Sequence, residues 1–179
     1  GTALISDFRY ARRPRYYPRR DQPWETALDG VRGIDERHRR VIRVMTQRDG
    51  NHDLLSGFQV RATRQVLTSL QGQSTTATVV GAGTGSGKTN AFYLPAFSYL
   101  ASIDDASAWT RALAVYPRIE LLKDQLETAF AHARRLDATW RSQVGRPLTL
   151  GALYGSTPSN ARDVRRNYRK WISRPSGMA

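Results

Sequence analysis

The sequence has no cysteine, and only three of its 28 basic residues are lysines. The absence of cysteine excludes disulfide scaffolds, zinc sites with thiolate ligands and thiol catalysis. The sequence also has no apolar run long enough to cross a bilayer and no signal-peptide pattern. We therefore expect a soluble, cytoplasmic protein without a membrane partner.

Positive charge dominates the chain but is unevenly distributed. The formal net charge is +13, and residues 51–130 contribute none of it because they hold six basic and six acidic side chains. Most of the basic side chains are guanidinium groups, which bind phosphate and carboxylate through paired hydrogen bonds, so the composition favours a polyanion as partner. Residues 8–23 combine arginine, tyrosine and proline without a helical or strand period, which predicts an extended arm. This arm could bind nucleic acid, remain a solvated tail or cross another part of a larger protein.

Apolar residues predict helices and strands in alternation. Helical spacing predicts helices over residues 34–48, 59–70, 90–101 and 119–136, and a further helix that begins at Thr157. Runs rich in β-forming residues predict strands over residues 75–80, 112–116 and 148–154. Strands and helices that alternate three times are typical of a parallel sheet with right-handed crossovers. We therefore expect an α/β fold in residues 51–179, preceded by a basic arm and an amphipathic helix in residues 1–50.

A glycine-rich loop joins the first expected strand to the next helix. It consists of Gly81, Ala82, Gly83, Thr84, Gly85, Ser86, Gly87, Lys88 and Thr89. Glycines allow successive backbone N–H groups to face phosphates, and the helix that starts there adds its positive end. In a loop of this kind Lys88 would reach the β- and γ-phosphates of ATP, and the Thr89 hydroxyl would bind Mg²⁺. Ala82 stands where the strict G-x-x-x-x-G-K-[ST] pattern has glycine, so this departure narrows the choice of P-loop families to which the chain could belong.

The loop and three other segments resemble motifs of superfamily 2 helicases. Residues 82–89, with the Phe92-Tyr93-Leu94-Pro95 tail, resemble motif I. Residues 116–125 resemble motif Ia, although Glu120 stands where that motif prefers alanine. Residues 155–158, followed by Arg162, are similar to a G-x-T-P-x-x-x-R segment, and Gln59 stands where these helicases carry a glutamine that reads adenine. In this order the motifs resemble the branch of Lhr-like and MrfA-like DNA helicases, which includes helicases of bacterial anti-phage systems such as DISARM.

The resemblance implies a RecA-like P-loop lobe and a role for each matched residue. Lys88 and Thr89 would act in catalysis, Gln59 would contact adenine, and the loop would hold ATP with Mg²⁺. The residues implied to grip the phosphates of one DNA strand are Pro117, Arg118, Gly155, Ser156 and Thr157. Arg162, Arg165 and Arg166 fall on one side of the last expected helix, where they could extend the DNA-binding surface or form a solvated face.

The acidic motif that ATP hydrolysis requires is missing after the loop. Hydrolysis needs a strand that ends in Asp and Glu, which hold Mg²⁺ and position the attacking water. Residues 35–38 spell D-E-x-H, but they precede the loop and lie in an amphipathic helix, so we reject them as this motif. We expect an incomplete first lobe that binds ATP and does not hydrolyse it alone. The rest of the helicase, and other defence-complex subunits, would be its partners.

An alternative function stays open. The chain could be a non-catalytic, nucleotide-regulated module that binds nucleic acid and recruits a partner. The two hypotheses differ in whether ATP is turned over when every partner is present. The choice between DNA and RNA rests on the resemblance alone.

Overall fold

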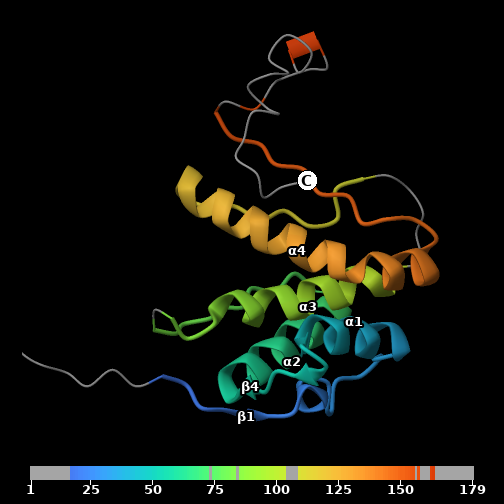
Figure 1. Ribbon diagram of the computed structural model, residues 1–179. Helices are drawn as coiled ribbons and strands as arrows, with labels where there is room; N and C mark the ends of the chain where they lie inside the picture. The colour runs from blue at the N-terminus through green and yellow to red at the C-terminus, as the bar shows by residue number, and fades with distance from the viewer. Residues whose placement is uncertain are drawn as a thin grey trace, which may run out of the picture.

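The computed structural model describes residues 17–72, 74–83, 85–103, 109–155, 157 and 162–163. Four helices dominate this part of the chain: α1 (Glu36–Thr46), α2 (Gly57–Gln71), α3 (Lys88–Ser102) and α4 (Ile119–Val144). A short 3-10 helix, η1 (Trp24–Ala27), packs against α1 and α2. Helix α3 packs against α1, α2 and α4, and α4 also packs directly against α1 (Figure 1). The four helices predicted over residues 34–136 are confirmed, and α4 extends eight residues further, to Val144.

The core lies between the helices. Its largest fully buried side chains include Ile42 from α1, Leu67 from α2, Leu94 from α3 and Leu136 from α4. Each helix therefore turns one apolar stripe towards a neighbour, which is the arrangement that 3.6-residue periodicity predicts. None of the helices in the described ranges is long and apolar enough to cross a membrane.

Helix α3 continues through Pro95, which lies in its middle. Proline removes a backbone donor and disfavours a helix interior, so local preference alone argues for a break here. Leu94 and Pro95 are both fully buried, and Phe97 is 5% exposed. Packing against α1, α2 and α4 is what holds this helix together, as is usual for helices in proteins.

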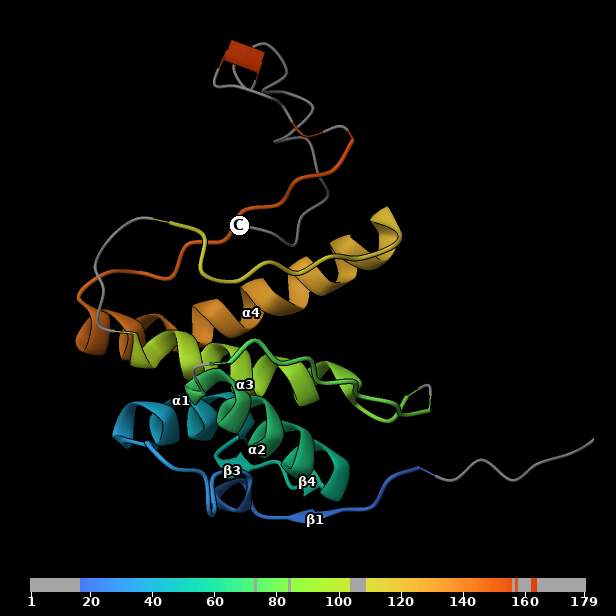
Figure 2. The same ribbon diagram turned by 180° about the vertical axis from the view of Figure 1, so that it is seen from behind.

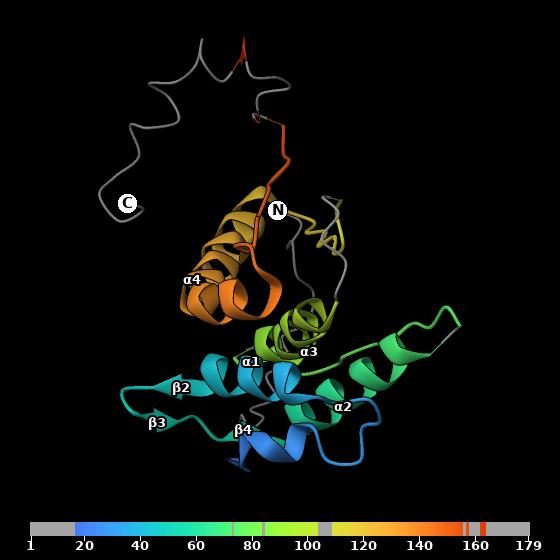
Figure 3. The same ribbon diagram turned by 90° about the vertical axis from the view of Figure 1, so that its right-hand side faces the viewer.

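Two small antiparallel pairs complete the described structure. Strand β1 (Arg20–Gln22) pairs with β4 (Leu55–Ser56), and β2 (Gln47–Arg48) pairs with β3 (Asn51–His52). The β2–β3 hairpin, seen at one side of the molecule in Figure 3, turns at Asp49 and Gly50. Both turn residues have positive φ, 48° and 81°, as a two-residue hairpin turn requires. The last part of the expected arm, residues 20–22, thus forms strand β1, because β4 supplies its backbone with a partner.

The structure does not show the expected parallel sheet. Residues 75–80, 112–116 and 148–154 form no strand in the described part of the chain. Figure 2 shows residues 109–118 as an extended yellow coil alongside α4. The apolar side chains of these segments are largely exposed, among them Val79 (94%), Leu113 (83%) and Leu153 (83%). A strand satisfies its backbone only through a neighbouring strand, and the sequence pattern reports only local preference.

Candidate functional site

The glycine-rich loop leads directly into α3. Gly87 is the N-cap of that helix, and both Gly85 and Gly87 have positive φ, 76° and 85°. A Cβ atom on Gly87 would also lie 2.8 Å from Gln59 Nε2, closer than real contacts allow. The backbone conformation therefore favours glycine at position 87, and a side chain there would also displace the Gln59 amide. Thr84 lies outside the described residues.

Lys88 is folded back onto its own loop. Its Nζ donates hydrogen bonds to the carbonyl oxygens of Ala82, at 2.6 Å, and Gly83, at 3.0 Å. The Ser86 hydroxyl donates to the same Gly83 oxygen at 2.7 Å. The ammonium group thus lies within the loop that the sequence predicts to hold phosphates. Thr89 follows in the first turn of α3, partly buried.

Gln59 joins the loop to the start of α2. Its Oε1 accepts hydrogen bonds from the backbone N–H and the hydroxyl of Ser56, at 2.9 and 3.0 Å. Its Nε2 donates to the carbonyl oxygen of Gly87 at 2.9 Å, and the side chain is 1% exposed. The structure therefore places Gln59 beside the loop and gives its amide two structural roles. A contact between Gln59 and adenine stays a prediction.

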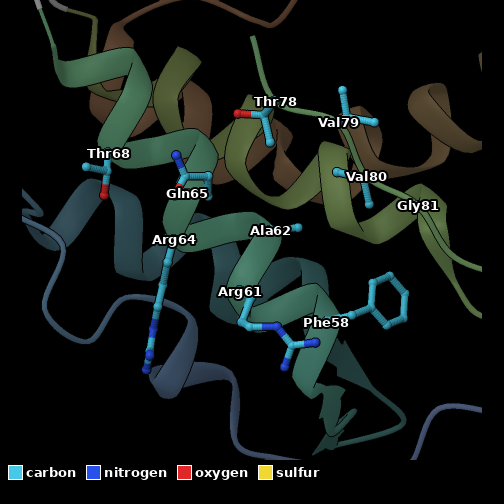
Figure 4. A pocket seen from close by; sticks show the side chains of 10 residues that line it. All are labelled: Phe58, Arg61, Ala62, Arg64, Gln65, Thr68, Thr78, Val79, Val80 and Gly81. Carbon is cyan, nitrogen blue, oxygen red and sulfur yellow. The ribbon is translucent and has the colours of Figure 1, made fainter. Parts of the chain in front are cut away.

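An open groove borders the loop on the side of α2. Its volume is about 520 Å³, and it separates α2 from the segment that runs into Gly81. Figure 4 shows Phe58, Arg61 and Arg64 extending from α2, with Val79 and Val80 on the opposite wall. Arg64 is anchored outside the groove, because its Nε donates to the Thr26 carbonyl oxygen at 2.7 Å. The groove offers an aromatic ring and positive charge beside the nucleotide loop.

The residues that resemble motif Ia are tied to α3 through one tyrosine. The Tyr93 hydroxyl lies 3.2 Å from that of Tyr116 and donates to the Gln125 carbonyl oxygen at 2.8 Å. Burial, reinforced by the hydrogen bond with Tyr116, raises the pKa of Tyr93 well above its usual value. Pro117 and Arg118 follow Tyr116 and are exposed, and Arg118 is the N-cap of α4. This pair is therefore free to meet a ligand.

The second group of predicted phosphate contacts is only partly described. Gly155 is exposed, and Thr157 closes a local turn with Tyr154: the Tyr154 N–H donates to Thr157 Oγ1 at 2.8 Å. Arg162 is exposed, whereas Ser156, Arg165 and Arg166 lie outside the described residues. In Figure 1 residues 148–155 run above α4, apart from the nucleotide loop at the left end of α3. The described residues thus do not bring Gly155 and Thr157 to the loop.

The D-E-x-H stretch is a helix cap. Asp35 is the N-cap of α1, and its Oδ1 accepts from the His38 backbone N–H at 3.2 Å and lies 2.6 Å from His38 Nδ1. Burial acts to raise the pKa of Asp35, but hydrogen bonds from His38 and Arg37 outweigh it and hold that pKa below its usual value. The rejection of these residues as a hydrolytic motif is consistent with this role.

Arg20 is a neighbour of the loop that the sequence did not indicate. Strand β1 pairs Arg20 with Ser56, and the guanidinium Nη2 lies 3.3 Å from the position of a Cβ on Gly87. The sequence carries one related signal, the S-x-x-Q capping box of α2, which starts at Ser56, the residue of β4 that pairs with Arg20.

A comparison with protein families decides the identity of the described core. The DEAD/DEAH box helicase family matches residues 57–166, more than half of the chain. The chain belongs to the DEAD/DEAH box helicase family. The match begins at α2 and includes the loop, α3 and α4, and it leaves Arg20 and α1 outside. Comparison with curated proteins and with solved structures found no significant match.

Membership brings ATP and Mg²⁺ into consideration, since helicases of this family use both. Among the described residues, no group of three His, Asp or Glu side chains could hold a metal ion by itself. The residues near the loop fit a metal that arrives with nucleotide phosphates. Thr89 offers the metal a single hydroxyl ligand, and Lys88 offers the phosphates a positive charge.

Proposed function

We propose that this chain is the ATP-binding portion of a superfamily 2 helicase or translocase that acts on DNA. The observation that carries the proposal is the loop itself, with Gly85 and Gly87 at positive φ and Lys88 at the start of a buried helix. The resemblance to the Lhr-like and MrfA-like branch supports DNA over RNA. Its DISARM-type members support a role in bacterial anti-phage defence.

Each residue of the loop has a role in this function. The N-terminus of α3 and the loop N–H groups would receive the phosphates, and Lys88 would exchange its two carbonyl partners for phosphate oxygens. Thr89 would hold Mg²⁺, which neutralises charge on the β- and γ-phosphates when bound. Gln59 would contact adenine from its position between α2 and Gly87.

Nucleic acid would bind on the side of the motif Ia residues. Pro117 and Arg118 are exposed at the N-terminus of α4, where backbone N–H groups and positive charge favour phosphate. Gly155, Ser156, Thr157, Arg162, Arg165 and Arg166 would complete this surface. That surface needs the RecA-like arrangement, in which residues 75–80, 112–116 and 148–154 pair as parallel strands.

The chain alone would bind ATP without hydrolysing it. No strand that ends in Asp-Glu follows Lys88 in the sequence. Hydrolysis would therefore depend on a hydrolytic motif and a second lobe supplied by the rest of the helicase. Other subunits of a defence complex are further partners in this proposal.

ATP binding by the 179-residue chain tests the proposal. We expect Lys88→Ala to weaken ATP binding by about tenfold to a hundredfold, because a hydrogen bond to a charged group contributes roughly 1.5–3 kcal/mol. Isothermal titration calorimetry with ATP and Mg²⁺ measures this. Lys123→Ala is the matched control, since Lys123 lies on α4 rather than in the loop, and it should bind ATP within about twofold of the unchanged chain.

Equal ATP affinity of the Lys88→Ala variant and the unchanged chain would contradict the proposal.

Fluorescence anisotropy with labelled DNA and RNA strands of one sequence tests the proposed binding to DNA. Binding to DNA should weaken steeply as salt rises, because arginines replace condensed counterions. Stronger binding to the RNA strand would overturn the assignment of DNA.

A further inference from the structure

The N-terminal segment reaches the nucleotide loop, although it lies outside the family match. Strand β1 pairs with β4 in antiparallel register, which sets Arg20 opposite Ser56. Ser56 bonds to Gln59, and Gln59 bonds to the carbonyl oxygen of Gly87. A short chain of contacts thus connects β1 to the residue at which α3 begins.

The Arg20 side chain ends at this same residue. Its Nη2 lies 3.3 Å from the position of a Cβ on Gly87, and Gln59 Nε2 lies 2.8 Å from it. Both Arg20 and the neighbouring Arg19 are exposed, but Arg19 pairs with Asp21 at 3.3 Å and no contact joins it to the loop among the described residues. Arg19 precedes β1, and its side chain extends into solvent, whereas the pairing of Arg20 with Ser56 brings the Arg20 side chain to the loop.

The position of Arg20 is electrostatically unfavourable without a ligand. A helix N-terminus carries partial positive charge, so cations are destabilising there and anions are stabilising. Lys88 adds a second positive charge in the first turn of α3, and this helix has no acidic residue in its first turn. No acidic side chain in the described ranges forms an ion pair with Arg20. Two cations and a helix N-terminus therefore converge where a polyanion would balance them.

We propose that Arg20 is a nucleotide-binding residue whose guanidinium contacts the phosphates of the ATP bound at the loop. This inference rests on the ATP binding proposed above. A guanidinium group presents two parallel N–H donors to a pair of phosphate oxygens, whereas an ammonium group acts as a point charge. The family core then binds its nucleotide with help from a strand that precedes it in the sequence.

Calorimetric titration of the 179-residue chain with ATP tests this. Arg20→Ala should raise the Kd for ATP by about tenfold, which corresponds to about 1.4 kcal/mol. Arg20→Lys should recover part of the loss, because charge remains while the paired geometry is lost. Arg19→Ala removes the same charge from the residue that precedes β1, whose side chain extends into solvent, and should change the Kd by less than about twofold. Thermal unfolding of each variant establishes that β1 and the loop are still folded.

A series of ligands locates the contact. If Arg20 meets phosphate, its substitution should weaken ATP and ADP binding and leave adenosine binding unchanged. An equal loss for adenosine would overturn the phosphate contact and assign Arg20 to the base. Unchanged ATP affinity in Arg20→Ala, with Lys88→Ala impaired, would overturn the inference and leave the proposed function standing. Failure of the unchanged chain to bind ATP would instead overturn the proposed function.

Discussion

The helices and the extended segments of this chain both carry large aliphatic side chains, but only the helices bury them. Leu67, Leu94 and Leu136 are at most 1% exposed, whereas Leu113 and Leu153 are 83% exposed. A helix satisfies its backbone by itself and needs only one neighbour for its apolar stripe. A strand needs a neighbour for its backbone and others for its two faces. The helices therefore show what local sequence and nearby packing achieve without the expected parallel sheet.

Truncation of one leucine in each region should give the largest contrast. Leu94→Ala should lower the free energy of unfolding by about 2–5 kcal/mol, because it leaves a cavity where α3 meets its neighbours. Leu113→Ala removes the same atoms from an exposed segment and should change it by less than about 0.5 kcal/mol. Urea denaturation of both variants measures the difference. A comparable loss in the two variants would mean that residues 112–116 are buried in solution.

A smaller effect should come from the contact that fixes α4 to α1. Arg135 donates to the carbonyl oxygens of Val44, at 2.8 Å, Met45, at 3.3 Å, and Gln47, so it binds the C-terminal end of α1. A cation is stabilising at a helix C-terminus, and Arg135→Ala should cost about 1–2 kcal/mol in urea denaturation. Arg134→Ala is the control, because this 69% exposed side chain pairs only with Asp137 among the described residues. Similar losses for the two variants would remove Arg135 from the helix contact.

The smallest effect should come from the cap of α1, and it should depend on pH. Asp35→Ala should cost about 1 kcal/mol at neutral pH. The pKa of Asp35 is lowered in the folded chain, so its stabilising contribution is complete above the unfolded pKa of about 3.9 and disappears as pH falls through the lower folded pKa. Thermal unfolding between pH 7 and pH 3 should therefore show the difference between Asp35→Ala and the unchanged chain shrinking in acid.

Asp35→Asn separates the cap from its charge. Asparagine is also a good N-cap, so this variant should keep most of the stability at neutral pH. Because asparagine does not titrate, the acid-dependent loss should be absent from it. An acid response equal to that of the unchanged chain would assign the pH dependence to another group.

The helices could be predicted from the sequence because their signals are local. Val41, Ile42 and Met45 recur at helical spacing, and α1 buries all three. Two local signals were available but unused: Asp49-Gly50, which is typical of a two-residue hairpin, and the S-x-x-Q capping box at Ser56 and Gln59. The loop, too, was predictable, since its four glycines and its lysine all lie within residues 81–88.

The remaining features depend on partners distant in sequence. Strand β1 forms because it pairs with β4, which lies more than 30 residues further along the chain. No pattern in residues 20–22 specifies that pairing. The approach of Arg20 to Gly87 follows from this pairing and from the fold of α2. The strands over residues 75–80, 112–116 and 148–154 have the composition of strands, but pairing depends on neighbours rather than composition.

The two hydrogen bonds from Lys88 to its own loop make the loop a competitor for the nucleotide. In the proposed ATP complex, the nucleotide would not meet a free ammonium group but would have to displace the carbonyl oxygens of Ala82 and Gly83. The affinity for ATP would then be the difference between two sets of hydrogen bonds, and a change that weakens the internal set would strengthen nucleotide binding without touching the nucleotide. Substitutions at residues 82 and 83 that turn these carbonyl groups away should thus raise the affinity for ATP.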